Sequence, residues 1–221
     1  GTMTIGSGST LDVSGSNFAI NIAGSWTNNG GTFTGGSGTV TFNGTGAQSI
    51  NGTATSQTFN NVIVNKTAGQ LLNTGGSTTS LTTNALTLTQ GNFTAPATLN
   101  INGNFLHTAG TFTAGANVNA SGNWTKNGGT FTPGTNTVTF TGSSAQLING
   151  SSATNFYNLT INESTSATTV TSQTTAFSVA NNLTVTQGNL IIQATDNNYT
   201  VTNNFTVSTN LSVSFVLSSI S

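Results

Sequence analysis

An internal repeat constrains the fold of this chain more than any other feature. Segments in the first half recur in the second half at an offset of 98 residues, which becomes 97 after a one-residue slip. The paired segments are 26–34 with 124–132, 39–42 with 137–140, 47–52 with 145–150, 59–65 with 156–162, and 89–92 with 186–189. Similarity sustained over about 80 residues indicates a fold that adds equivalent units side by side.

A shorter period lies inside this repeat. Apolar and polar residues alternate in short stretches such as 39–42 and 159–161. This alternation is typical of strands with one buried face, and no stretch shows helical periodicity. Two series of apolar residues advance by about 20 residues per step, which is the size of one coil of a β-solenoid. The first series is Ile22, Phe42, Val64, Leu81, Ile101, Ala120, Phe140, Ile161, Val179 and Val201; the second is Phe33, Ile50, Leu72, Phe93, Phe112, Phe131, Ile148, Val170, Leu190 and Leu211.

The two periods together predict an all-β fold, a single continuous β-solenoid over residues 1–221. We expect coils of about 20 residues, with about five coils in each repeat. The repeat units would lie at approximately 11–110 and 111–210. About eleven coils at about 4.8 Å each would give a rod of roughly 50 Å. A jelly roll or an immunoglobulin-like sandwich would not produce the short period inside the long one. The residues expected to stack in the core are Phe33, Phe93, Phe112, Phe131, Ile101, Phe140 and Ile161.

The near absence of charge excludes several classes of function. Charged residues make up 2% of the chain, with two Lys, no Arg, three acidic residues, one His and no Cys. Nucleic-acid binding needs clusters of Lys and Arg, and a thiolate metal site needs Cys. Stacked coils also disfavour charge, because equivalent positions lie close enough for like charges to repel. We therefore expect no enzyme, no cofactor and no bound metal.

The few ionisable residues are weak site candidates. His107 could act as a ligand or a base, but it precedes a turn and has no acidic neighbour in the sequence, so a structural role at the turn is favoured. Asp12, Glu163 and Asp196 could bind calcium or form a carboxylate pair. The predicted coils place these three on separate turns, which argues against both.

Two uncharged features could bind a ligand at the surface. Trp26 and Trp124 could stack on sugars, although their recurrence beside Asn-Gly-Gly turns fits a structural corner better. Thr-x-Thr triplets resemble the ice-binding faces of solenoid antifreeze proteins, but Thr is also the ordinary outward residue of an uncharged strand. The triplets lie at 32–34, 39–41, 87–89, 111–113, 130–132, 137–139 and 184–186.

The repeat unit also resembles a known group of proteins. The residues Gly38-Thr39-Val40-Thr41-Phe42-Asn43-Gly44, followed by Gln48-Ser49-Ile50-Asn51-Gly52, are similar to the Gly/Thr/Asn-rich β-solenoid repeats of large secreted bacterial surface proteins. The resemblance to the β-helical passengers of filamentous adhesins and autotransporters is looser. Together these resemblances imply a right-handed β-helix, an extracellular or cell-surface location and an adhesive or scaffolding role. They imply no catalytic residue.

The two ends of the chain suggest how it could act. Neither end shows a capping helix or a charged cap, and residues 211–221 form an apolar segment that could be a terminal strand in contact with another subunit. We expect no signal peptide and no membrane insertion, so the chain would be mature, trimmed or a fragment. The candidate interface residues are Met3, Ile5, Leu211, Val213, Phe215 and Leu217. The leading hypothesis is a subunit of a self-assembling surface filament or adhesive stalk that pairs with copies of itself. The alternative is an ice-binding or glycan-binding module of a larger adhesin.

Overall fold

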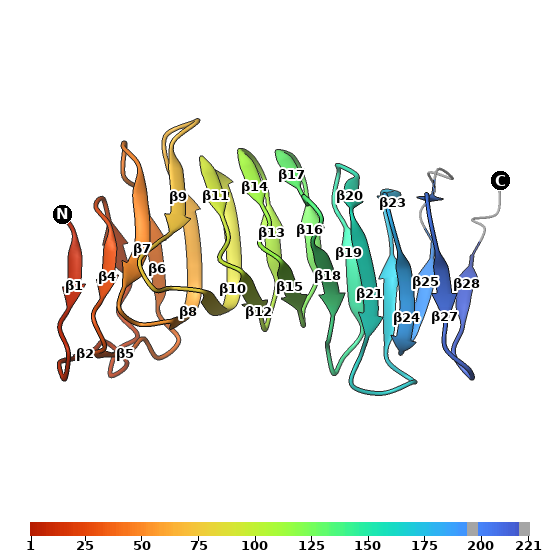
Figure 1. The fold of residues 1–221 in the computed structure, drawn as a ribbon, viewed down its shortest axis with the longest axis horizontal. Helices are drawn as coiled ribbons and strands as arrows, with labels where there is room; N and C mark the ends of the chain where they lie inside the picture. Colours follow the sequence, from red (N-terminus) through yellow and green to blue (C-terminus); the bar gives the residue numbers. More distant parts are fainter. Residues whose placement is uncertain (194–198, 217–221) are drawn as a thin grey trace.

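The structure, a computed structural model, describes residues 1–193 and 199–216. Within those residues it contains 28 strands and no helix, and neighbouring strands pair in parallel. The strands wind into a β-solenoid of about nine turns, about 22 residues apart, with the first and the last of the described strands at opposite ends of the rod (Figure 1). The predicted fold class is therefore confirmed. The turns are longer and fewer than the eleven coils predicted, and at a strand spacing of about 4.8 Å they make a rod of about 43 Å.

Each turn places one strand on each of three faces, which the chain visits in a fixed order. Face 1 consists of β1 (Met3–Ile5), β4 (Trp26–Asn28), β7 (Gln48–Gly52), β9 (Leu71–Thr74), β11 (Asn92–Thr94), β14 (Thr111–Thr113), β17 (Thr130–Thr132), β20 (Thr154–Phe156), β23 (Phe177–Val179) and β26 (Thr200–Val201). Ladder pairing is interrupted between β17 and β20, where ring contact between Phe131 and Phe156 continues the face.

Faces 2 and 3 share two long strands, β8 (Ser56–Asn65) and β10 (Ser80–Gln90), each of which turns a corner and serves both faces. Face 2 contains β2 (Thr10–Asp12), β5 (Thr32–Thr34), the first halves of β8 and β10, β12 (Thr98–Ile101), β15 (Asn117–Ala120), β18 (Thr137–Phe140), β21 (Asn158–Asn162), β24 (Leu183–Gln187) and β27 (Phe205–Val207). Face 3 contains β3 (Ile20–Ile22), β6 (Thr39–Phe42), the second halves of β8 and β10, β13 (Phe105–His107), β16 (Trp124–Lys126), β19 (Gln146–Asn149), β22 (Thr169–Ser172), β25 (Asn189–Ile192) and β28 (Val213–Phe215).

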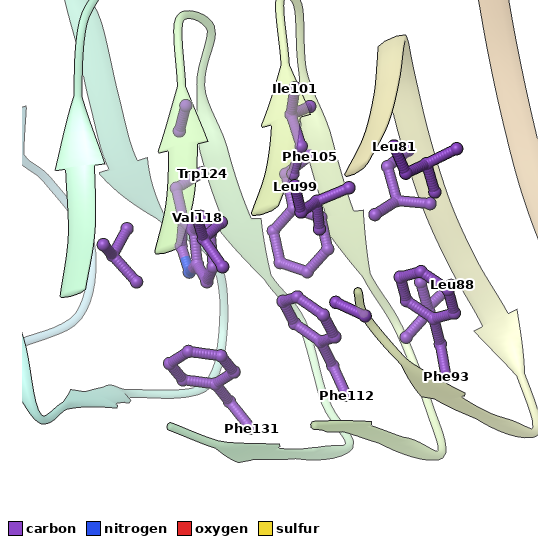
Figure 2. Close-up of a cluster of buried hydrophobic side chains, with 14 of the residues drawn as sticks. Leu81, Leu88, Phe93, Leu99, Ile101, Phe105, Phe112, Val118, Trp124 and Phe131 are labelled. Carbon is purple, nitrogen blue, oxygen red and sulfur yellow. The ribbon is translucent and has the colours of Figure 1, made fainter. Parts of the chain in front are cut away.

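The interior is a set of apolar columns that run along the rod. The alternation in the sequence becomes an alternation of burial, so that in β6 and β18 the Val and Phe side chains are buried and the Thr side chains point outward. On face 1 the rings of Phe93 and Phe112 stack at 5.7 Å with an interplanar angle of 11°, and Phe131 follows at 5.3 Å (Figure 2). Such contacts bury large apolar surfaces, which is the main source of stability available to a chain this poor in charge.

The expected core residues lie as follows. Phe93, Phe112, Ile101, Phe140 and Ile161 are fully buried, and Phe131 is 8% exposed. Phe33 is only half-buried and packs against the edge of the core.

The two predicted apolar series are correct only in part. The first follows face 3 from Ile22 through Phe42 to Val64, whose next partner is Leu88 rather than Leu81. Leu81 lies on face 2 and pairs with Leu99. The alternation alone misplaces this step, because β10 carries core positions for two faces in one uninterrupted strand.

The long repeat also differs from the prediction of about five coils. Trp26 lies in β4 and Trp124 in β16, which comes fourteen strand positions later when β8 and β10 are each counted twice. Fourteen positions on three faces are four turns and two thirds of another. The second copy is therefore rotated by one face relative to the first, so that Trp26 belongs to face 1 and Trp124 to face 3.

Candidate functional site

The two tryptophans are part of the core. Trp26 and Trp124 are 1% and 0% exposed. The Trp26 ring packs edge-on against Phe33 and Phe59, and its Nε1 donates to Gln57 Oε1 at 2.8 Å. Trp124 packs in the same way in the second copy, and its Nε1 donates to the hydroxyl of Thr154 at 3.2 Å. The structural interpretation holds, and neither ring is available to stack on a sugar at the surface.

Equivalent grooves lie beside the two tryptophan clusters. The groove in the first copy has a volume of about 550 Å³ and is lined by Thr27, Asn51 and Gly52 among others. The groove in the second copy, of about 510 Å³, is lined by the matching Thr125, Asn149 and Gly150. Both are open and lined by small uncharged residues. Because of the rotation between copies, the first groove opens on face 1 and the second on face 3.

From β8 to β27, face 2 presents a regular surface. Two columns of outward Ser, Thr and Asn side chains run along it, each in register from turn to turn. One is Ser56, Ser80, Thr98, Asn117, Thr137 and Asn158, and the other is Thr58, Thr82, Asn100, Asn119, Thr139, Thr160, Thr184 and Thr206. Hydrogen bonds join neighbours within a column, such as that from Asn119 Nδ2 to Asn100 Oδ1 at 2.8 Å. Of the Thr-x-Thr triplets, 137–139 contributes both of its Thr residues to these columns and 184–186 contributes Thr184 alone. On face 1, 111–113 stacks directly on 130–132.

The acidic side chains do not come together. Asp12 is exposed in the first turn, where hydrogen bonds from the Ser14 hydroxyl and backbone amide lower its carboxyl pKa. Glu163 follows β21, in the second half of the rod, and Asp196 lies outside the described residues. The described part of the chain has no cluster of three metal-ligating side chains. The carboxylate pair that the sequence left open is therefore not formed between Asp12 and Glu163.

His107 ends β13, at the turn where the sequence placed it, but it is fully buried. Its Nε2 lies 3.2 Å from the carbonyl oxygen of Gly110, and its Nδ1 has no hydrogen-bond partner among the described residues. Burial is the main reason why the pKa of His107 is lowered, and the neighbouring Lys126 of the next turn acts in the same direction. The lowered pKa favours the neutral ring, and His107 lies in register between Leu88 and Lys126 of the neighbouring turns.

Lys66 is a buried ionisable residue that the sequence reasoning missed. Lys66 is 1% exposed, although Lys is almost never fully buried without partners. Its ammonium donates to the carbonyl oxygens of Gly44 and Gly46 and to Gln48 Oε1. Extending the repeat match at 59–65 by one residue would have placed Lys66 opposite Glu163, which is also 1% exposed. The sequence offered no sign that either charge was buried.

The C-terminal end of the described rod exposes apolar side chains that elsewhere belong to the core columns. Phe205 and Val207 on β27 are 48% and 38% exposed, and Phe215 on β28 is 64% exposed. Beside them is an apolar recess of about 120 Å³, whose lining includes Phe177 and Tyr199.

The candidate interface residues divide between the two ends. Met3 and Ile5 lie on β1, partly and fully buried, and Leu211 and Val213 pack partly against the core near Phe215. Leu217 lies outside the described residues.

Comparison with known proteins finds no matching family model, no matching curated protein and no matching solved structure. In the part of the chain that the structure describes, no helix is long and apolar enough to cross a membrane.

Proposed function

We propose that this chain is an extracellular structural protein, which builds a surface filament or adhesive stalk by pairing the open ends of its solenoid with further copies. The exposed apolar end formed by Phe205, Val207 and Phe215 carries the proposal. Such an edge offers both unpaired backbone groups and uncovered apolar area, and it is a template for another strand.

The strand order at the two ends supports pairing between copies. Among the described residues, β26, β27 and β28 are the last strands of faces 1, 2 and 3, and β1, β2 and β3 are the first. Pairing β1 on β26, β2 on β27 and β3 on β28 would continue all three faces in parallel. Head-to-tail contacts of this kind generate an open fibre rather than a closed ring.

The composition of the edges supports the same proposal. Soluble sheets protect their edges with Lys, Pro or inward charges. The strands of the last described turn carry none of these, and the only charged side chain in the first turn is the outward Asp12. The low net charge of −1 also provides little repulsion between copies. The surface location rests on the resemblance to secreted surface proteins.

The test is electron microscopy and sedimentation of the purified chain over a range of protein concentrations. We expect filaments whose length grows with concentration, with a layer line near the strand spacing of about 4.8 Å. Phe215→Lys places a charge on the exposed edge and should shorten or abolish the filaments. Thr139→Lys, outward in the middle of face 2, is the matched control and should leave them intact. Monodisperse rods from the unmodified chain at all concentrations would contradict the proposal.

A second candidate function, ice binding, is favoured by the two uncharged columns on face 2. They resemble the flat Thr arrays of solenoid antifreeze proteins, and their turn-to-turn register is continuous from Thr58 to Thr206. Inhibition of ice recrystallisation measures this activity directly. The same two variants separate the proposals, since Thr139→Lys should remove ice binding and Phe215→Lys should not. No effect of the unmodified chain on ice growth would exclude it.

A further inference from the structure

Phe33 is an aromatic residue of the core cluster that the rod leaves only half-buried. Its ring packs edge-on against Trp26 at 4.8 Å and lies 5.7 Å from the ring of Phe59. Its equivalent in the second copy, Phe131, packs edge-on against Trp124 at 5.3 Å and is only 8% exposed (Figure 2). The two copies thus place the same ring in the same kind of cluster, but the first copy leaves part of it uncovered.

Gly35 keeps space open beside the Phe33 ring. A Cβ added at Gly35 would lie 3.1 Å from two atoms of that ring. The second copy has Pro133 at the equivalent position. The turn is the same in both copies, since Gly38 N donates to Gly35 O as Asn136 N donates to Pro133 O. Proline therefore fits this turn, and its ring occupies the space that glycine leaves empty.

The backbone ladder is also open beside Phe33. Among the described residues β5 pairs with β2 alone and forms no ladder with β8, the strand of the following turn. Thr32 N donates to Ser9 O, and Thr34 O accepts from Val13 N, so these groups point to the preceding turn. Because successive residues of a strand direct their N–H and C=O groups to opposite sides, those of Phe33 point towards the following turns.

A groove of about 270 Å³ occupies this gap. It begins at Phe33 and ends at Asn102, and its lining comes from four successive turns. Three steps of about 4.8 Å make it about 14 Å long, and it runs along the rod, across the strands. Every side chain that lines it is uncharged, and most are polar.

Three asparagine side chains follow one another along the groove. Asn60, Asn84 and Asn102 lie on successive turns, at the corner between faces 2 and 3. Outward Asn side chains elsewhere on the rod bond to one another, as Asn119 Nδ2 does to Asn100 Oδ1. No side-chain hydrogen bond joins any of the three to another described residue, and both Asn84 and Asn102 are exposed. Their amides are therefore free to bind a ligand.

We infer that this groove binds a short neutral oligosaccharide. One sugar ring lies against the uncovered part of the Phe33 ring, where its carbon-bound hydrogens meet an apolar surface. Hydroxyl groups along the rest of the ligand bond to the amides of Asn60, Asn84 and Asn102. An amide both donates and accepts hydrogen bonds, as a sugar hydroxyl does, so the two kinds of group match.

Other ligands suit the groove less well. A nucleic acid or an acidic glycan needs Lys or Arg, and the lining contains neither. A peptide that adds a strand would run beside β5, whereas this groove crosses the strands. The site is separate from the exposed strands β27 and β28 that carry the proposed assembly, so either proposal can fail alone.

The test is binding of the purified chain to immobilised neutral oligosaccharides of glucose, galactose, mannose and N-acetylglucosamine. Oligosaccharides of galacturonic acid and short uncharged peptides are the comparisons. We expect binding to at least one neutral oligosaccharide and to none of the comparison ligands. Saturation-transfer NMR with the bound oligosaccharide should show the closest contact at the carbon-bound hydrogens of one sugar ring, which is the ring beside Phe33.

Two variants make the result specific to this groove. Gly35→Pro copies the second repeat, so it should keep the fold and abolish binding by filling the space beside Phe33. Asn84→Ala removes one amide and should weaken binding about threefold to tenfold, the effect of one hydrogen bond. Asn155→Ala changes an exposed amide on β20, outside the groove, and should bind like the unmodified chain. Melting temperatures show whether each variant is folded.

Four results would overturn the inference. One is no binding to any neutral oligosaccharide, and another is undiminished binding by folded Gly35→Pro. The third is an equal change of affinity in Asn84→Ala and Asn155→Ala, which decides the matter even if Gly35→Pro does not fold. The fourth is stronger binding of a peptide or of an acidic oligosaccharide, which would contradict a neutral sugar ligand.

Discussion

Replacing Glu163 by glutamine should remove most of the pH dependence of stability between pH 4.5 and pH 8. Burial raises the pKa of this carboxyl group from 4.5 to about 7. Below pH 4.5 both the folded and the unfolded chain hold the proton, so ionisation has no effect there. As the pH rises towards 7 the unfolded chain releases the proton first, and the folded state loses stability until its own carboxyl group ionises.

The size of the effect follows from the two pKa values, 4.5 and about 7. Each pKa unit is worth about 1.4 kcal/mol, so the carboxyl group costs the folded state about 3 kcal/mol once it is ionised. Glutamine resembles the protonated acid and keeps that stability at high pH. The two proteins should therefore be equally stable at pH 4.5 and differ by about 3 kcal/mol at pH 8.

Urea unfolding followed by tryptophan fluorescence measures this difference, since Trp26 and Trp124 are buried in the folded state. Choline chloride is the salt of choice, so that no small cation offsets the buried charge. Burial lowers the pKa of His107 below its ordinary value of 6.5, so its stabilising contribution is lost as the pH falls below 6.5, a trend opposite to that of Glu163. It is common to both proteins and cancels in the comparison. Parallel stability curves for the two proteins across the whole pH range would refute the reasoning.

Five further substitutions test the structure, and two of them serve as matched controls. Gly110→Ala should lower the melting temperature much more than Gly69→Ala. Both glycines have a φ of 79° and so share the left-handed strain, but only at Gly110 would the new Cβ lie 1.7 Å from a backbone oxygen of the preceding turn. Equal losses would contradict the close stacking of turns. Lys66→Met leaves buried acceptor oxygens without their donor. It should cost about 1–3 kcal/mol in urea unfolding, and an unchanged midpoint would refute that role. Phe112→Ala, at a fully buried ring, should cost about 3–5 kcal/mol in the same assay. The Phe18 ring is 64% exposed. Phe18→Ala should therefore change stability by less than about 0.5 kcal/mol, and similar costs for the two Phe variants would contradict the assignment of the core.

The fold class could be predicted from the sequence because two independent periods agree. The alternation in stretches such as Thr39-Val40-Thr41-Phe42 defines strands with one buried face. The steps of about 20 residues exclude folds that do not stack. The exact register could not be predicted. In β10, Leu81 and Leu88 are both core positions, but they belong to different faces, and nothing in an alternating pattern marks where the strand turns the corner.

The burial of Lys66 and Glu163 could not be predicted from the sequence, because a charged side chain is normally exposed. Lys66 and Glu163 appear as isolated charges in a polar sequence, and only the structure shows that stacked turns enclose them. Mistaking Trp26 for an exposed sugar-binding residue could be avoided from the sequence. Its recurrence 98 residues later, within the same run of turn residues, indicated a structural role that the buried ring bears out.

The rotation between the two copies has a consequence for how the rod meets its surroundings. A motif repeated after a whole number of turns would always lie on the same face of the rod. Here the groove beside Trp26 opens on face 1 and its equivalent beside Trp124 opens on face 3. A third copy at the same spacing would open on face 2, and a fourth would return to the first direction. The motif therefore follows a helical path around the rod. A longer rod built in this way would offer the same features to partners that approach any of its three faces.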